Sequence, residues 1–432
     1  MSAQNTGGAA TPPAGGMSST DQTASPMRKR GRQFSTGVTI GIAVVLLAVG
    51  LGGGYVLGAY LTKTSATTID ITEAGSTLLE PMMDIWGPAY TSHVNSHVTL
   101  SPAGGGSGTG QSESEAGTID IGASDAYTAN NLGVVDVPVA ISSQLVMYNL
   151  GSSFVGHHLN LNGTMLAEIY DGTITSWNAP LIQEANPGVS LPATTIVPVV
   201  RSDSSGDTYI FSAYCDIAYK GWLYGNSTKA FQTIAPANGF QSGNGNVGII
   251  NKLNNLTGGI GYVGVSYKTS ALSAGKLAYA ALGDNLANTA AGGNVTATPS
   301  DAKNFINWSA QNVSYDASLG LNELNYAADG LAVSLILGGS PAGPTTWSTG
   351  GGGTNPTSGD PSPYPITNLE YTLVKTAPKD ATHQTYVVEF LQWAISYGNN
   401  ATTYLDQVNF IALTPQLQGL DQLALSAVQI AP

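Results

Sequence analysis

One stretch of the chain, residues 195–214, changes from a strand pattern to a helix pattern within a few residues. Residues 195–200 are an almost continuous apolar run, which predicts a buried strand, and residues 209–214 have apolar positions spaced as in a helix. The eight residues between them are polar or small and therefore predict a strand-to-helix turn. A chain built from repeated units of this kind is expected to fold as an α/β protein.

The chemistry of this turn suits an oxyanion. Ser204, Ser205 and Gly206 are small enough to let an anion approach backbone N–H groups at the positive end of a helix dipole. Arg201 adds a planar fork of donors that matches an oxyanion with two parallel hydrogen bonds. Taken alone, the stretch is equally well interpreted as a polar surface loop that carries an arginine.

Two further segments offer donors of the same kind. Residues 69–90 predict a second strand, turn and helix, with the hydroxyl groups of Ser76 and Thr77 in the turn. A short strand at 98–100 precedes a glycine-rich loop, 104–111, that contains Ser107. This loop has neither a Walker lysine nor the G-x-G-x-x-G spacing of nucleotide sites, and it lacks the G-x-S-x-G pattern of a hydrolase nucleophile. We expect it to close around a small anion.

Asp125 stands at the tip of a predicted strand, residues 118–126, where a simple anion site would avoid a negative charge. A carboxylate there can accept the proton of a ligand that still carries one. The alternative is a structural aspartate that caps a turn or a helix.

The N-terminal region predicts a membrane anchor. Residues 1–36 are polar, without apolar periodicity, and are expected to form a disordered cytoplasmic tail. Residues 37–61 contain no charged residue, and at roughly 1.5 Å per residue they reach about 37 Å, enough to cross a membrane. A cleaved signal peptide is the alternative, but the run is long, starts late and has no A-x-A site after it. Four basic residues precede the segment, which places everything after it outside the cell.

Charge and cysteine content exclude several kinds of partner. Residues 1–61 hold four basic residues and one acidic residue, so residues 62–432 hold 10 and 26, a net charge of −16. This charge repels nucleic acid, and any anion site must rely on local donors. Cys215 is the only cysteine, which rules out an intrachain disulfide, and its apolar neighbours predict a core position. His93 and His97 are spaced for one helix face, but no carboxylate or cysteine joins them, so we expect no metal and no cofactor.

Several motifs occur in the order and approximate spacing of one known family. The principal motifs are residues 75–78, 106–108, 121–125 and 201–208, and the others are 166–178, 186–188, 258–263, 393–395 and 405–408. Through these motifs the chain, from about residue 71 to 425, resembles the PstS-type phosphate-binding proteins of ABC transporters.

This resemblance implies a two-lobed periplasmic-binding-protein-like α/β fold with hinge strands and with the ligand in the cleft. Lobe one would comprise residues 70–149 and 364–432, with chain crossings near Asn149 and Tyr364. Lobe two would comprise residues 150–363, including an insertion rich in Gly, Ser and Pro at 338–363.

The resemblance also implies a set of ligand-binding residues. Phosphate would be held by Thr77, the Leu78 N–H, Ser107, Asp125, Arg201, Ser205 and Gly206. Asp203 would position Arg201, and Ser76 and Thr208 would lie close by. Asp207 stands where many members have Thr, so that it either orients Thr208 or takes a second ligand proton. Ser204 stands where the family usually has Gly, which predicts a tighter or reshaped turn.

The expected function is that of an extracellular, membrane-anchored protein that binds inorganic phosphate and delivers it to the permease subunits of an ABC transporter. One alternative is a binding protein or sensor for another oxyanion. The other is an enzyme acting on phosphate esters, which would need a nucleophile with a base, or a metal. The four principal motifs contain no histidine, so we expect no enzyme activity.

Overall fold

The computed structural model describes residues 68–282 and 366–428, apart from 127, 129–132, 220, 225–230, 232, 238, 414 and 427. The described residues all belong to one compact unit. Within them, no helix has the length and apolar character needed to cross a membrane. The predicted tail at 1–36, the anchor at 37–61, the insertion at 338–363 and the crossing at Tyr364 lie outside the described residues.

The described strands form one large sheet in the order β2-β1-β3-β11-β4-β8-β6-β7, with β9 also paired to β4. Neighbours are parallel within β2-β1-β3 and within β8-β6-β7, whereas β11 and β4 run antiparallel to their neighbours. The strands are β1 (Ile69–Gly75), β2 (Val98–Ser101), β3 (Ile121–Ser124), β4 (Val134–Tyr148), β6 (Val197–Arg201), β7 (Gln241–Gly243), β8 (Gly259–Gly264), β9 (Ala278–Tyr279) and β11 (Thr367–Lys375). A second, two-stranded sheet joins β5 (Asn160–Leu161) to β10 (Ala281–Leu282).

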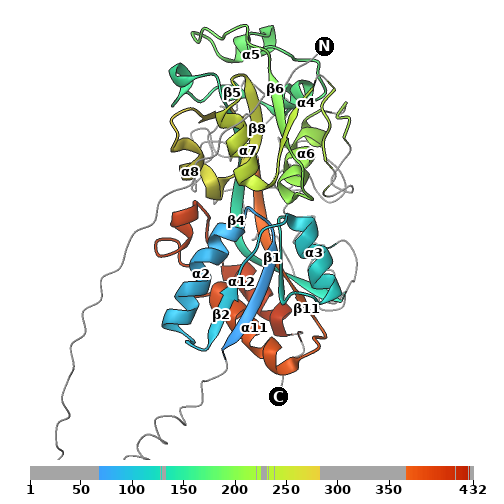
Figure 1. Ribbon diagram of the computed structural model, residues 1–432, viewed down its shortest axis with the longest axis vertical. Helices are drawn as coiled ribbons and strands as arrows, with labels where there is room; N and C mark the ends of the chain where they lie inside the picture. Colours follow the sequence, from blue (N-terminus) through green and yellow to red (C-terminus); the bar gives the residue numbers. More distant parts are fainter. Residues whose placement is uncertain are drawn as a thin grey trace, which may run out of the picture. The chain divides into compact units, whose positions relative to one another are not determined.

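Strand β4 connects the two parallel parts of the sheet (Figure 1). Its first part, up to Ser143, pairs with β11, and its last part, from Gln144 to Tyr148, pairs with β8. All fifteen of its residues are buried, so the strand lies in the interior of the described unit. The change of partner comes shortly before Asn149, where the sequence predicts a crossing between lobes.

Helices cover both parts of the sheet, as the alternating sequence pattern predicts, and the mixed α/β fold is therefore confirmed. The first part is covered by α2 (Glu80–His93), α3 (Ser107–Ala116), α11 (Ala381–Ala394) and α12 (Pro415–Ser426). The second part is covered by α6 (Gly206–Ala218) and α7 (Gly245–Asn254), and α4 (Gly163–Tyr170) packs on α6. Shorter helices are η1 (Ser152–Phe154), α5 (Pro180–Ala185), η3 (Val265–Tyr267), α8 (Lys268–Leu272) and η4 (Leu405–Val408).

The glycine-rich segment 104–111 is not the loop that the sequence predicts. Helix α3 already begins at Ser107, directly after Gly106, whose φ of 88° permits the sharp entry. A Cβ on Gly110 would lie 2.8 Å from the Ala74 carbonyl oxygen and would also overlap that of Ala123. Glycine at this position therefore permits the close packing of α3 on the sheet. Because α3 begins at Ser107, the N-terminus of a helix lies here in place of the predicted loop.

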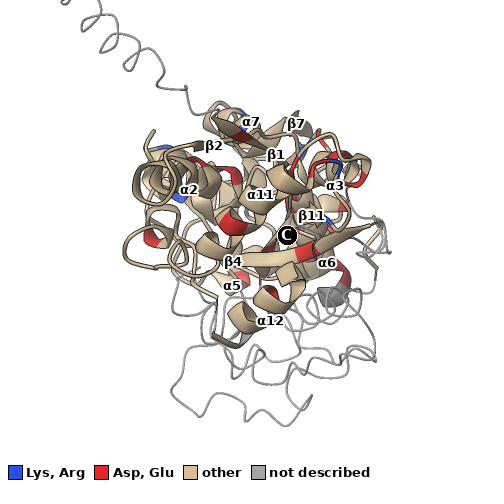
Figure 2. Cartoon of the chain, turned by 90° about the horizontal axis from the view of Figure 1, so that it is seen from below, with Lys and Arg blue, Asp and Glu red and all other residues tan. Residues whose placement is uncertain are grey.

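Acidic residues outnumber basic ones in the part of the chain that the structure describes, as Figure 2 shows by the many red and few blue segments. The acidic positions are spread over several helices and strands. The described residues therefore carry an excess of negative charge of their own, and they do not attract an anion over long distances.

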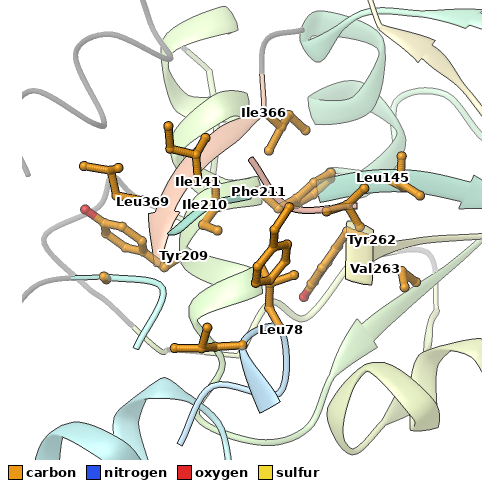
Figure 3. Close-up of a cluster of buried hydrophobic side chains, with 14 of the residues drawn as sticks. Leu78, Ile141, Leu145, Tyr209, Ile210, Phe211, Tyr262, Val263, Ile366 and Leu369 are labelled. Carbon is orange, nitrogen blue, oxygen red and sulfur yellow. The ribbon is translucent and has the colours of Figure 1, made fainter. Parts of the chain in front are cut away.

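An aromatic and aliphatic cluster lies where α6 meets β8 (Figure 3). Phe211 stacks on Tyr262 with ring centroids 4.6 Å apart and an angle of 19° between the ring planes. Leu78 belongs to the same cluster and packs against Gly264, where a Cβ would overlap it. The turn after β1 is thereby anchored against β8. Cys215 is fully buried, as predicted.

Candidate anion-binding site

Asp125 follows β3 and is the residue at which three helix starts meet. Its side chain accepts a hydrogen bond from Ser76 Oγ, in the turn before α2, and its N–H donates to Ser107 Oγ, at the start of α3, over 3.0 Å. Gly206, the first residue of α6, is so close that a Cβ there would overlap both Ser107 Oγ and Asp125 Oδ2. The buried carboxylate thus lies among three positive helix ends.

The hydroxyl groups at these helix starts satisfy backbone donors. Ser76 Oγ accepts from the N–H groups of Leu78, at 3.1 Å, and Leu79, at 3.2 Å. Ser205 caps α6 by accepting from the Thr208 N–H at 3.3 Å. The Leu78 N–H, which the family resemblance assigns to the ligand, donates to Ser76 here, and an anion would have to replace or share that bond.

Arg201 ends β6 with its guanidinium buried between two carboxylates. Nε donates to Asp203 Oδ1 at 2.8 Å, Nη2 donates to Asp203 Oδ2, and Nη1 donates to Asp207 Oδ2. The planar fork of Nε and Nη2 is thus occupied by Asp203, and two of the five guanidinium N–H groups stay available, one on each Nη. Burial lowers the pKa of Arg201, but the two aspartates outweigh it and raise that pKa above its ordinary value, so the group stays charged.

Asp207 is fully buried and surrounded by donors. Its Oδ1 accepts from Gln144 Nε2 at 3.0 Å, and its Oδ2 accepts from Asn246 Nδ2 at 2.8 Å in addition to Arg201. The sequence leaves open whether Asp207 orients Thr208. The Thr208 hydroxyl lies 2.7 Å from the hydroxyl of Tyr262, so this tyrosine holds it. Asp207 acts in this structure as a counter-ion of Arg201.

Asn246, near the start of α7, ties the two parts of the sheet together across the site. Its Nδ2 donates to Thr77 Oγ1 at 3.0 Å as well as to Asp207, and its Oδ1 accepts from the Gly264 N–H at 2.8 Å. A backbone contact adds to this link, because the Gly108 N–H donates to the Ser204 carbonyl at 3.0 Å.

The structure therefore brings the predicted residues to one place, and it adds residues that the sequence analysis missed. The additional ones are Gln144, Asn246, Tyr262 and Glu370. Asn246 could have been found, because residues 241–254 repeat the strand, polar turn and helix pattern of the other segments. No group of His, Cys, Asp and Glu in the described part of the chain could hold a metal ion.

Comparison with known proteins shows where the chain belongs. It is 27% identical over 354 residues to the phosphate-binding protein PstS of Xylella fastidiosa strain 9a5c, covering 81% of this chain and 83% of that protein. It is 29% identical over 351 residues to PstS of Haemophilus influenzae, covering 80% and 90%. The solved structure of a human phosphate-binding apolipoprotein shares the fold with a TM-score of 0.58 at 17% identity, over 83% of this chain and 94% of that one. A family model described as a PBP superfamily domain matches residues 61–397, and the chain therefore belongs to the PBP superfamily.

Proposed function

We propose that this protein binds inorganic phosphate outside the cell and delivers it to the permease subunits of an ABC phosphate transporter. One observation carries the proposal: the buried carboxylate of Asp125 lies where three helix N-termini and the hydroxyl groups of Ser76 and Ser107 meet. Helix N-termini, hydroxyl groups and the two remaining Arg201 N–H groups suit the oxygens of a tetrahedral anion. Asp125 suits a proton on that anion.

This combination favours phosphate over sulfate. Near neutral pH phosphate keeps at least one proton, which a carboxylate can accept in a charge-assisted hydrogen bond. Sulfate carries none, so Asp125 would meet only lone pairs and negative charge. An unpaired buried acceptor costs roughly 1–3 kcal/mol or more, which corresponds to about ten- to a hundredfold in affinity.

The relatives support the ligand, since PstS of Xylella fastidiosa and of Haemophilus influenzae are named phosphate-binding proteins and match four fifths of this chain. In the proposed arrangement, residues 37–61 anchor the protein in the cell membrane and residues 62–432 lie outside it. Lobe one, residues 70–149 and 364–432, and lobe two, residues 150–363, would close on the phosphate about β4. Thr77, Ser107, Asp125, Arg201, Ser205 and Gly206 would contact the ligand, and the Leu78 N–H would join them on binding.

Titration calorimetry with residues 62–432 tests the proposal. We expect phosphate and arsenate to bind, because both keep a proton, and sulfate to bind at least about tenfold more weakly. Sulfate binding as tight as phosphate binding would favour a receptor for another oxyanion. A folded protein that binds none of the three anions would refute the proposal.

A further inference from the structure

Glu370, on β11, lies beside Asp125 although the two are far apart in the sequence. Tyr371 pairs with Ser124 between β11 and β3, which places Glu370 level with Asp125 on the neighbouring strand. Asn368 connects them, because its Nδ2 donates to the Asp125 carbonyl at 2.7 Å and lies 3.3 Å from Glu370 Oε1. Glu370 is fully buried, and the two carboxyl groups lie within hydrogen-bond reach of each other.

Only one of the two carboxyl oxygens of Glu370 accepts hydrogen bonds from the described residues. Its Oε1 accepts from Ser142 Oγ and from Asn368, whereas its Oε2 has no donor partner among the described residues. Two ionised carboxylates in contact inside a dry interior repel each other, and nothing between them offers a proton. A single proton held between the two groups removes the repulsion and supplies the missing hydrogen bond.

The surroundings place this proton on Glu370. Burial and the charge of Asp207 raise the pKa of Asp125 to about 7, but the Ser76 hydroxyl and the charge of Arg201 oppose this rise and favour the ionised form of Asp125. Among the residues that the structure describes, no cation stabilises an ionised Glu370. Burial, followed by the charge of Asp125, raises the pKa of Glu370 well above its ordinary value, and the hydrogen bond to Asp125 raises it further. The same hydrogen bond favours the ionised form of Asp125.

We propose that Glu370 is a positioning residue that determines ligand specificity: a neutral carboxylic acid whose O–H donates to Asp125. It keeps Asp125 as an ionised acceptor directed at the ligand, and it limits the pair to one negative charge beside the bound anion. The inference deepens the proposed phosphate binding and rests on it. If Glu370 loses its proton, a second negative charge adjoins the anion, so affinity should fall as pH rises.

The variant Glu370→Gln separates the proton from the shape of the side chain. Its amide NH₂ can donate to Asp125 in place of the O–H, its amide oxygen can still accept from Ser142, and it cannot ionise. In the full-length chain we expect phosphate affinity near pH 7 within about threefold of wild type, with the preference over sulfate kept. Wild type should lose affinity towards alkaline pH relative to the variant. The titration of phosphate itself affects both proteins equally, so the ratio of their dissociation constants isolates Glu370.

Two more variants complete the comparison. Glu370→Met has similar length but no donor, and we expect it to lose at least about tenfold in phosphate affinity and much of the discrimination against sulfate. Glu73→Gln is the matched control. Glu73 is also buried, on β1, and burial raises its pKa well above the ordinary value, but no hydrogen bond joins it to Asp125. Removing the ability of Glu73 to ionise should leave the pH profile of binding unchanged.

Infrared difference spectroscopy tests the shared proton without any ligand. Subtracting the spectrum of Glu370→Gln from that of wild type should reveal the carbonyl band of a protonated carboxylic acid. A carboxylate band in its place, or equal pH profiles for wild type and Glu370→Gln, would overturn the inference. If wild type binds no phosphate, the proposed function fails, while the infrared result still decides whether Glu370 holds the proton.

Discussion

At the scale of single residues, Arg201 shows why an arginine cannot be exchanged for a lysine. Arg201→Lys keeps the charge but loses the fork that Asp203 holds, and with it the fixed direction of the two remaining donors. We expect a loss of roughly 1.5–3 kcal/mol in phosphate binding, measured by titration calorimetry. The exposed Lys252→Arg, the reverse exchange, is the control. An unchanged dissociation constant in Arg201→Lys would remove this residue from the site.

Asp125 is the residue that should discriminate between anions. In Asp125→Asn the amide NH₂ can donate where the carboxylate could only accept. We therefore expect discrimination against sulfate to weaken much more than phosphate binding does, measured by competition with sulfate and arsenate. Asp84→Asn changes the same charge at an exposed position and should leave both anions unaffected. Strong sulfate binding by wild type would show that Asp125 does not recognise the ligand proton.

At the scale of elements, the site depends on how closely α6 approaches the turns of the other part of the sheet. In Gly206→Ala the added Cβ would overlap Ser107 and Asp125, so the start of α6 would have to move away. We expect phosphate affinity to fall by more than about tenfold with helix content unchanged. Gly419→Ala, in α12, meets no atom within 4 Å and should keep full binding while stabilising the fold by about 0.5–1 kcal/mol. Equal affinities of the two variants would contradict the close approach.

The sequence predicts those elements in which a polar turn separates two periodic segments, as in residues 69–90 and 195–214. It fails for α3, because the glycines of 104–111 indicate a loop when only the local pattern is considered, whereas they allow the helix to pack on the sheet. Glu370 escapes notice for another reason. Its partner Asp125 is 245 positions away along the chain, and only strand pairing brings them together. The one local signal is a carboxylate inside a strand of mostly apolar and β-branched residues.

At the scale of the whole molecule, buried acids make stability depend on pH. Burial raises the pKa of Asp136 to about 7, and it raises those of Glu73, Glu370 and Asp421. A raised pKa in the folded state stabilises the fold below the unfolded pKa, near 4, and this contribution is lost as pH rises through the folded pKa. We therefore expect a higher melting temperature at about pH 5 than at about pH 8, and a smaller difference in Asp136→Asn. A melting temperature that rises over this range would contradict the assignment.

Because β4 belongs to both parts of the sheet, it should affect how the described unit unfolds. One unbroken backbone carries the ladder to β11 and then the ladder to β8, so disorder in either segment of β4 loosens the strand on which the other ladder is built. The two parts should therefore lose their structure in one cooperative step. The amide hydrogens between Val135 and Met147, where only Pro138 has none, should be among the last to exchange with solvent. The strand about which the proposed lobes would close should therefore also couple their unfolding.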